Sequence, residues 1–455
     1  AYDPVDFEIG IRNNLPIITV INRRGRMTFS HDRFAAPGGK EKEIIRQLSD
    51  LKVKEARIKT VELLEQSGKL LKREPLRHAV GVCYRCKSTI EPMLLPQWFI
   101  KIKPLAEPAI KAVKEGRTKI VPKKRFEKMY FDWLENIRDW NISRQVVWGP
   151  RLPVWYCPDC NPKLQISFLA KSGQRVEGLY SELKQNHSFE EIGSGLQSLI
   201  ADKEAVYQLD SGRCQKCGGP TFQETDTFDT WFLSGQWPLT TLGFNLDDPK
   251  KSSADFKYFY PTSVLDTLWD ILFFWVGRMM MFGLYLTDEV PFKVVHIHAR
   301  VVDKNGQKMS KSKGNVTDPL VMINQYGADA LRLALVTGVA PASDIALSEE
   351  KIRGQRNFTN KLWNIGRFIL MNLEGKEAPF YEREMAGLAA EDQEMIEKLN
   401  QLIRSTTDDL DHYRFGQAAE NLYHFIWHEF ADKYVEGVKS RLQTGDLVAL
   451  SVLRH

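Results

Sequence analysis

The chain has 455 residues, enough for about three domains with sizeable cores and a site between them. Its composition of 43% hydrophobic and 27% charged residues, with 21 Pro and 30 Gly, excludes a largely disordered, collagen-like or disulfide-scaffold chain. The 63 basic and 58 acidic side chains give a net charge of +5, which permits a nucleic-acid partner but does not argue for one.

Nothing in the sequence favours a targeting segment. No charged-then-apolar leader opens it, and the strongest apolar stretch, residues 270–286, is interrupted by Arg278. These features support neither a signal peptide nor a membrane span, so we expect a cytoplasmic protein with no membrane partner. The chain begins at Ala1 without an initiator Met and ends at His455 within a helical pattern, so we also expect a fragment.

The first half of the chain combines short strands and helices. Residues 15–22 are rich in β-branched side chains and predict a β-rich opening, whereas residues 40–72 are charged and amphipathic and predict helix. Residues 77–153 carry short apolar runs, four tryptophans and several prolines. This pattern is typical of an irregular segment that packs on a larger body.

The second half changes character twice. Residues 219–345 alternate strand-like and helix-like stretches, which predicts a parallel α/β sheet. After Asp344 apolar residues recur at helical spacing to the end of the chain, which predicts a helical bundle.

All six cysteines fall in three CxxC pairs: Cys83 with Cys86, Cys157 with Cys160, and Cys214 with Cys217. Two such pairs supply the tetrahedral four-sulfur shell that Zn²⁺ prefers, so we expect one structural zinc held by the second and third pairs. The 53 residues between those pairs (161–213) must then fold out as an insertion. The first pair is left with half a site: either its partners lie outside this sequence or it is a redox pair.

A lysine-rich loop at 303–315 follows the strand-like run 294–302. Glycines let such a loop move, and its ammonium groups can then follow charge that develops on phosphates in a transition state. The alternative is a solvated basic hairpin. The string KMSKS at 308–312, followed by Gly314 and Asn315, favours the functional interpretation.

This string resembles the second signature of class I aminoacyl-tRNA synthetases, and nearly the whole chain is similar to their valine-specific branch. The matching stretches, in the family's order, are DPVDFEIG (3–10), EPMLLPQWFIK (91–101), DWNISRQVVWG (139–149), DTWFLSGQWPLTTLGF (229–244), DILFFWVGRMM (270–280), KMSKSKGNVTDPL (308–320), YGADALRL (326–333) and NFTNKLWN (357–364). The fourth and fifth stretches point to the valine branch rather than to the isoleucine or leucine branches.

The resemblance implies an α/β fold: the second half of a Rossmann-like nucleotide-binding domain, with part of an α+β editing domain, a zinc-binding insertion and a C-terminal helical bundle. The implied boundaries are 1–90 for the editing part, 91–153 for the return into the catalytic domain, 154–218 for the zinc-binding insertion, 219–345 for the second catalytic half with its KMSKS loop, and 346–455 for the stem-contact and anticodon-binding bundle. The family's first signature, an HxGH motif, is absent, so we do not expect this chain to aminoacylate alone.

The implied activity is ATP-dependent activation of valine, with Mg²⁺ on the ATP, and transfer to tRNA(Val) by a monomer. Trp231, Ile271 and Trp275 match positions that line the valine pocket, and two indoles with a β-branched side chain make a rigid apolar wall. Without the resemblance, such residues are usually core. Asp270 opens the apolar helix and needs a partner, for which the nucleotide ribose and the helix N-terminus both remain open.

The resemblance also assigns the loop and an editing site. Lys308 and Lys311 would clamp the triphosphate, and Ser310 and Ser312 would shape the loop. The editing residues, which would hold the hydroxyl and ammonium of misacylated threonine, are Asp3 and Asp6; the family's preceding His is Tyr2 here. A second site is needed because an apolar pocket cannot strongly reject an added hydroxyl. Outside the family, a DxxD is often a turn or a helix cap.

Basic side chains on the C-terminal helices resemble the family's tRNA contacts, although a charge run on a helix is usually a solvated face. They are Arg353, Arg356, Lys361, Arg367, Lys433, Lys439 and Arg441. Two alternatives remain open: a non-catalytic zinc-ribbon module that binds tRNA, and one half of a split synthetase. The KMSKS loop and the two pocket tryptophans argue against the first alternative.

Overall fold

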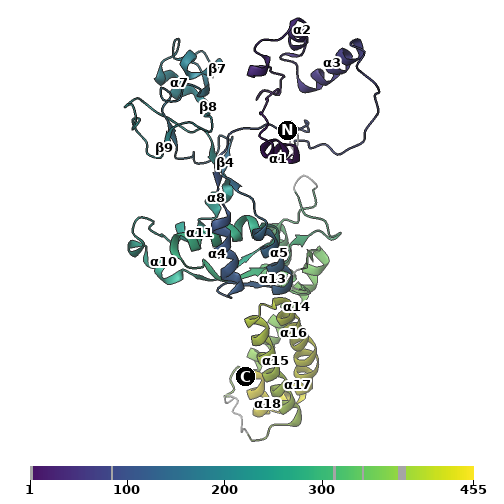
Figure 1. Ribbon diagram of the computed structural model, residues 1–455. Helices are drawn as coiled ribbons and strands as arrows, with labels where there is room; N and C mark the ends of the chain where they lie inside the picture. Colours follow the sequence, from purple (N-terminus) through teal and green to yellow (C-terminus); the bar gives the residue numbers. More distant parts are fainter. Residues whose placement is uncertain (1–3, 84–85, 311–313, 341–342, 378–385) are drawn as a thin grey trace. The chain divides into compact units, whose positions relative to one another are not determined.

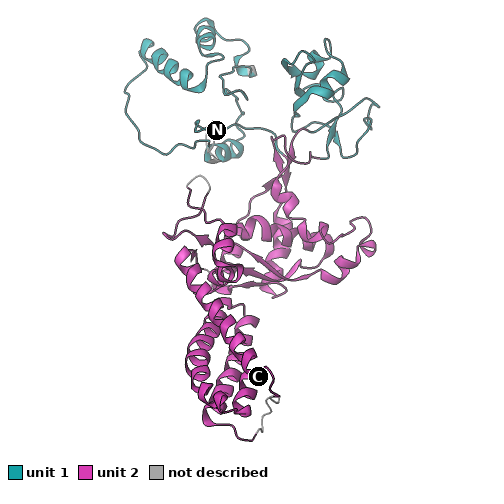
Figure 2. Cartoon of the chain, turned by 180° about the vertical axis from the view of Figure 1, so that it is seen from behind, with its two compact units in different colours: residues 1–97, 153–224 teal, residues 98–152, 225–455 magenta. Residues whose placement is uncertain are grey.

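A computed structural model describes residues 4–83, 86–310, 314–340, 343–377 and 386–455 of the chain (Figure 1). The chain divides into two compact units, and each unit is assembled from two separate stretches of sequence. Unit 1 comprises residues 1–97 and 153–224, and unit 2 comprises residues 98–152 and 225–455 (Figure 2).

The first stretch of unit 1 is mainly helical. Its elements are α1 (Pro4–Arg12), the 3₁₀ turn η1 (Asp32–Phe34), α2 (Gly39–Leu48) and α3 (Val53–Gln66). The amphipathic pattern at 40–72 therefore forms helices as expected. The β-rich opening is wrong: within the described residues, 15–22 forms no ladder, only a single bridge from Ile21 to Met27. A strand needs a partner as well as β-branched side chains.

The second stretch of unit 1 contains two small antiparallel sheets. One has the order β10–β5–β9 (Phe222–Gln223, Trp155–Tyr156, Tyr207–Gln208); the other has the order β7–β6–β8 (Arg175–Leu179, Gln165–Leu169, Leu196–Ile200) and carries α6 (Tyr180–Leu183) and α7 (Phe189–Gly195). Phe168 and Ile192 are fully buried in the second part. A Cβ at Gly195 would lie 2.1 Å from the carbonyl oxygen of Leu169, so only glycine fits there. The residues between the cysteine pairs thus form a folded insertion.

Unit 2 is built around a parallel sheet of order β12–β13–β2 (Thr262–Thr267, Phe292–Ile297, Lys119–Val121). Phe292 at the start of β13 and Val295 within it are both fully buried, at 0% exposure. Helices α4 (Lys103–Lys114), α5 (Lys123–Glu135) and α11 (Gly277–Thr287) belong to the same layered body. The sheet confirms the parallel α/β expectation, and the irregular segment 77–153 supplies one of its strands.

Shorter elements complete the body of unit 2. They are β1 (Phe99–Ile100), β3 (Trp140–Asn141), β4 (Ser143–Arg144), β11 (Thr227–Phe228), α8 (Thr230–Ser234), α9 (Trp237–Thr240), η2 (Pro249–Lys251), α10 (Ala254–Phe259), η3 (Trp269–Ile271), η4 (Leu272–Val276), β14 (Val301–Val302), α12 (Pro319–Tyr326), α13 (Ala328–Val336) and β15 (Ile345–Ala346).

The apolar stretch Trp269–Thr287 is long and apolar enough to cross a membrane by length and composition alone. It begins as the 3₁₀ turn η3, widens to the π turn η4 and continues as α11, which packs against α4. Leu272, Met279 and Met280 are fully buried. In this structure the stretch is therefore a core helix of unit 2.

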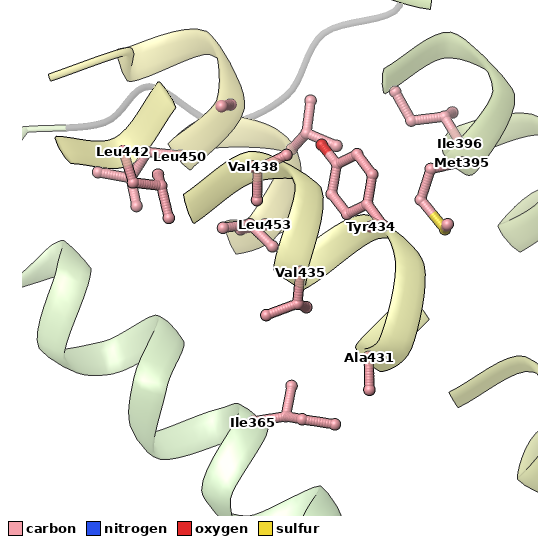
Figure 3. Close-up of a cluster of buried hydrophobic side chains, with 12 residues drawn as sticks. Ile365, Met395, Ile396, Ala431, Tyr434, Val435, Val438, Leu442, Leu450 and Leu453 are labelled. Carbon is pink, nitrogen blue, oxygen red and sulfur yellow. The ribbon is translucent and has the colours of Figure 1, made fainter. Parts of the chain in front are cut away.

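The C-terminal part of unit 2 is the expected helical bundle. Its elements are α14 (Glu349–Leu373), α15 (Ala390–Asp411), α16 (Phe415–His424), the π-helix η6 (Phe425–Val435), α17 (Glu436–Gln443) and α18 (Leu447–Arg454). Figure 3 shows its core, where Tyr434, Val435 and Val438 lie among side chains of the other helices, including Ile365 of α14 and Met395 of α15.

A buried ion pair ties this bundle together. The Asp392 side chain is fully buried, and its two oxygens accept hydrogen bonds from Arg441 at 2.9 and 2.8 Å and from the Tyr434 hydroxyl at 2.7 Å. Burial alone would raise the pKa of Asp392, but the hydrogen bonds from Arg441 and Tyr434 outweigh it and lower that pKa. The carboxylate is therefore ionised in the folded bundle.

We expect Asp392→Ala to lower the free energy of unfolding of the bundle by about 3 kcal/mol, because it leaves a guanidinium without its buried partner. Asp446, 2.8 Å from Arg441, keeps the effect near the lower end of the usual range. Since the folded pKa of Asp392 is lowered, its stabilisation is complete above the unfolded pKa of about 4 and is lost as the pH falls below it.

Urea unfolding followed by helical circular dichroism, at neutral pH and near pH 3, measures both effects. The matched control is Asp411→Ala at the exposed end of α15, which should stay within about 0.5 kcal/mol of the wild type. Equal effects of the two substitutions would contradict the assignment of a buried pair.

Candidate active site and metal centre

Four cysteine sulfurs meet in unit 1. The Sγ atoms of Cys157, Cys160, Cys214 and Cys217 all lie within 4.8 Å of one another, with pairs at 3.4 and 3.9 Å. Tetrahedral zinc with bonds of about 2.3 Å requires sulfur separations of about 3.8 Å. The four residues therefore fit a Zn²⁺ ion, and they form the one group of three or more potential ligands among the described residues.

The strands of the small sheet bring these cysteines together. β5 ends directly before Cys157, β9 precedes Cys214, and β5 pairs with both β9 and β10. Backbone N–H groups of Cys217 and Lys216 lower the pKa of the Cys214 thiol to about 7, whereas burial raises that of Cys157 to about 12. A bound metal would favour the thiolate at every position.

Asn161 joins the two halves of this centre, and sequence patterns did not single it out. Its amide donates to the carbonyl oxygens of Cys157 at 2.8 Å and Val206 at 2.9 Å, and its oxygen accepts from the Val206 N–H at 2.8 Å. The side chain is buried at 7% exposure. It therefore fixes the first cysteine turn to the strand that leads to the second.

Two backbone hydrogen bonds of the described residues at Cys83 match two at Cys214. In each turn, the first cysteine N–H donates to a carbonyl five residues on, and its own carbonyl accepts from the N–H four residues on, at 2.8–2.9 Å. The residue four positions after the first cysteine has positive φ in both turns, +59° at Lys87 and +74° at Gly218. Hydrogen bonds from Ser88 lower the pKa of Cys86 to about 7. The two interpretations of this pair, a metal half-site and a redox pair, both stay predictions.

Two tryptophans expected in an amino-acid pocket lie on neighbouring elements of unit 2. Trp231 is on α8 and stacks on Phe274 of η4, with ring centroids 5.7 Å apart. Trp275, the next residue of η4, donates from Nε1 to the carbonyl oxygen of Ser234 on α8 at 3.0 Å. Ile271 ends the turn just before η4. All three expected side chains are half-buried.

Asp270 lies close to the carboxyl end of the parallel sheet, since η3 follows the end of β12. Its Oδ1 atom is buried and has no hydrogen-bond partner among the described residues. A buried carboxylate oxygen without a donor is costly, which points to a ligand that supplies one. Arg300, just before β14, has its guanidinium 6.0 Å from the ring of Trp269, so this turn and the strand entering the lysine-rich loop are neighbours.

The KMSKS loop is held by its acidic and amide residues. Asp303 accepts from the backbone N–H groups of Asn305 and Gln307, and its other oxygen accepts from the Asn315 amide at 2.8 Å. The Asn315 oxygen accepts from the N–H of Ser310 at 2.9 Å. Lys308 is exposed, and its backbone forms an antiparallel bridge with Val302. Lys311 and Ser312 lie outside the described residues.

Of the two editing residues, Asp3 lies outside the described residues and Asp6 is in the first turn of α1. The Asp6 side chain is exposed and borders a cavity of about 440 Å³ in unit 1, lined mainly by residues 15–21 and 92–94. Its helical position matches the helix-cap alternative, and the cavity beside it is compatible with a ligand.

Several of the basic residues of the bundle are engaged in ion pairs within the bundle. Arg441 pairs with the buried Asp392, so this part of its charge is already neutralised within the bundle, and its RNA contact stays a prediction. Three others make ion pairs within the bundle: Lys361 with Asp432, Lys433 with Glu429, and Lys439 with Glu436. Of the expected set, Arg367 borders a groove of about 810 Å³ between α13 and α14.

Comparison with known proteins agrees with this geometry. Residues 25–348 match the family of class I tRNA synthetases (I, L, M and V), and residues 392–455 match the anticodon-binding domain of tRNA ligases. The chain belongs to the class I tRNA synthetase family.

Within this family, the chain is similar to valine–tRNA ligases. It is 43% identical to that of Geobacter sulfurreducens over 98% of the chain and 44% of the relative, and 44% identical to that of Carboxydothermus hydrogenoformans over 97% and 43%. The chain thus spans less than half the length of these relatives.

Solved structures agree on the fold. Methionyl-tRNA synthetase of Mycobacterium tuberculosis, in complex with methionyl-adenylate, superposes with a TM-score of 0.53 at 17% identity, covering 82% of this chain and 61% of that one. A leucyl-tRNA synthetase of Agrobacterium radiobacter in a tRNA complex gives 0.50 at 21% identity, covering 70% and 39%.

Proposed function

We propose that this chain carries the second catalytic half of a valine–tRNA ligase, which activates valine with ATP and transfers it to tRNA(Val). The observation that carries the proposal is that Arg300, just before the strand that enters the KMSKS loop, lies 6.0 Å from the ring of Trp269, next to Asp270 and close to the carboxyl end of the parallel sheet. Ligands of open α/β sheets bind at this edge. The two indole walls and the names of the relatives support valine as the amino acid.

In the proposed reaction, a carboxylate oxygen of valine attacks the α-phosphorus of ATP and pyrophosphate leaves. A terminal hydroxyl of the tRNA then attacks the valyl carbonyl and AMP leaves. Trp231, Ile271 and Trp275 would enclose the isopropyl group and exclude water. Lys308 and Lys311 would offset the charge that develops on the phosphates, and Asp270 would accept from a ribose hydroxyl. Mg²⁺ enters with ATP as part of the substrate.

The other parts of the proposal concern the editing site, the zinc site, the cellular location and the oligomeric state. Asp3 and Asp6, with the cavity beside α1, would hold the hydroxyl and ammonium of a mischarged threonine while water hydrolyses its ester bond to tRNA. A structural Zn²⁺ would occupy the four-cysteine centre. Cys83 and Cys86 would supply two ligands of a second metal. We place the protein in the cytoplasm, because its proposed tRNA substrate is found there. The resemblance described above implies that it is a monomer.

Valine-dependent exchange of pyrophosphate into ATP tests this proposal. We expect exchange with the complete gene product and none with residues 1–455 alone, because the resemblance places half of the phosphate-binding apparatus in an HxGH segment that this sequence lacks. Isoleucine, leucine and methionine serve as controls for the amino acid. Exchange that is faster with one of these three than with valine would contradict the assignment.

A further inference from the structure

A buried carboxylate caps the helix that carries Trp231, one of the expected walls of the amino-acid pocket. Asp229 is 5% exposed and caps α8, since its Oδ1 accepts from the Trp231 N–H at 3.3 Å. Its Oδ2 accepts from Trp140 Nε1 at 2.9 Å and pairs with Arg144 at 3.0 Å. The start of α8, and with it the backbone of Trp231, is thus fixed to β3 and β4.

Arg278 reaches the same cluster from the other side. Its guanidinium lies over the Trp140 ring at 4.1 Å and within 5.5 Å of the Phe274 ring centroid. One of its N–H groups donates to the carbonyl oxygen of Phe274 at 2.8 Å. That carbonyl belongs to the π turn η4, so Arg278 holds the turn that carries Trp275.

These contacts connect the two expected pocket walls, Trp231 and Trp275, to each other. Phe274, held by Arg278, is the ring on which Trp231 stacks, and Trp275 is anchored to the Ser234 carbonyl of α8. α8 also approaches α11 closely, because a Cβ on Gly235 would lie 2.7 Å from the Phe282 ring. The spacing between α8 and η4 is therefore fixed at both ends.

We propose that Arg278 is a positioning residue that sets the separation of the Trp231 and Trp275 walls and thereby the size of amino-acid side chain that the site accepts. The inference rests on the proposed activation of valine. It adds a determinant of size selectivity that does not itself touch the substrate.

Arg278 costs stability where it stands. Burial lowers its pKa to about 10, and Asp229, whose charge partly offsets this effect, also pairs with Arg144. An apolar side chain would fill the space without that desolvation cost. The guanidinium offers what an apolar chain cannot, a planar cation that stacks on Trp140 while donating to a π-turn carbonyl.

The first test measures selectivity in the complete gene product. In pyrophosphate exchange, we expect Arg278→Met to raise the KM for valine and to lower the preference for valine over isoleucine, in kcat/KM, by about tenfold. Valine and isoleucine differ by one methylene, and an apolar pocket discriminates such a pair by about 10- to 200-fold in kcat/KM. The KM for ATP should stay unchanged.

A second variant, Arg278→Lys, keeps the charge but not the planar guanidinium. Its preference for valine over isoleucine should fall between that of the wild type and that of Arg278→Met. The control is Arg404→Met on the exposed face of α15.

The second test needs no activity and uses residues 1–455. The 11 tryptophans are labelled with 5-fluorotryptophan, and Trp140, Trp231 and Trp275 are assigned in fluorine-19 NMR spectra by substitution with Phe. Arg278→Met should shift all three resonances: that of Trp140 directly, that of Trp231 through Phe274 and through Trp140 and Asp229, and that of Trp275 through η4. Arg404→Met should shift none.

The outcomes separate the two proposals. A wild type without valine-dependent exchange contradicts the proposed function, while the spectra still decide whether Arg278 holds the two walls. A wild type with exchange, a variant with unchanged preference and a shift confined to Trp140 would overturn the positioning role. A uniform loss of kcat with every amino acid would also overturn it, as would an Arg278→Lys variant equal to the wild type.

Discussion

Replacing Lys308 by alanine in the complete gene product should lower the rate of valyl-adenylate formation by one to two orders of magnitude. A charge-assisted contact is worth about 1.5 to 3 kcal/mol, and one made mainly in the transition state appears in the rate. The same loss is expected for Lys311→Ala from its place in the motif. Binding of ATP in the ground state should weaken far less.

Single-turnover adenylate formation, measured beside equilibrium ATP affinity, separates this role from that of a solvated loop. The matched control is Lys304→Ala, an exposed lysine in the same loop but outside the KMSKS string, which should leave the rate within about twofold. Unchanged rates in Lys308→Ala would remove the catalytic role. A rate loss equalled by weaker ATP binding would make the lysine a ground-state anchor.

The purified chain should contain one tightly bound zinc per molecule, and Cys157→Ser should reduce that content to near zero. Three thiolates and a hydroxyl cannot satisfy a structural zinc as four thiolates do, and the free energy of metal binding also stabilises the fold. We therefore expect the melting temperature of the insertion to fall with the metal content. Elemental analysis and thermal unfolding on the same sample measure both.

The half-site offers a control of the same chemistry. Cys83→Ser removes a thiol from a position whose backbone hydrogen bonds match those at Cys214, and in residues 1–455 it should change neither zinc content nor melting temperature. Folded wild-type protein without zinc would contradict the assignment. Equal loss of zinc from both variants would show that the first pair already shares in the bound metal.

The cysteine centre was predictable because CxxC is a local signal. Spacing alone identified the two turns that the structure brings together. The same reasoning could not identify Asn161, whose hydrogen bonds join backbone segments 45 residues apart and leave no pattern in the sequence. Asp229 escaped notice for the same reason, since its partners come from β3, β4 and α8. The sequence marked Arg278 only as an interruption of the apolar stretch, because its contact with Trp140 joins residues far apart in the chain.

Periodicity predicted where helices lie but not how their turns are wound. The apolar run at 270–286 was predicted to be a helix, and the structure divides it into 3₁₀, π and α turns. Those turns depend on contacts such as the bond from Arg278 to the Phe274 carbonyl. The predicted strand at 15–22 failed because pairing is not a local property.

Charge was the least transferable signal. Arg441 resembled a surface cation, but its partner Asp392 lies 49 residues away in sequence and is fully buried. A basic side chain on an amphipathic helix reads the same in sequence whether it meets solvent, an acidic neighbour or a buried carboxylate. The roles of Lys308, Asp270 and the pocket tryptophans stay predictions until measured.

The four-cysteine centre and the three-stranded sheet beside it make the segment between Asn161 and Val206 a replaceable module. Asn161 and the centre close the chain at the two ends of this segment, while β6, β7 and β8 pair with one another inside it. The entropy of closing a loop grows only with the logarithm of its length, so exchanging residues 162–205 for a ten-residue linker changes the closure free energy by about 1.3 kcal/mol. The segment can therefore change in length and sequence without loss of the metal centre that anchors it.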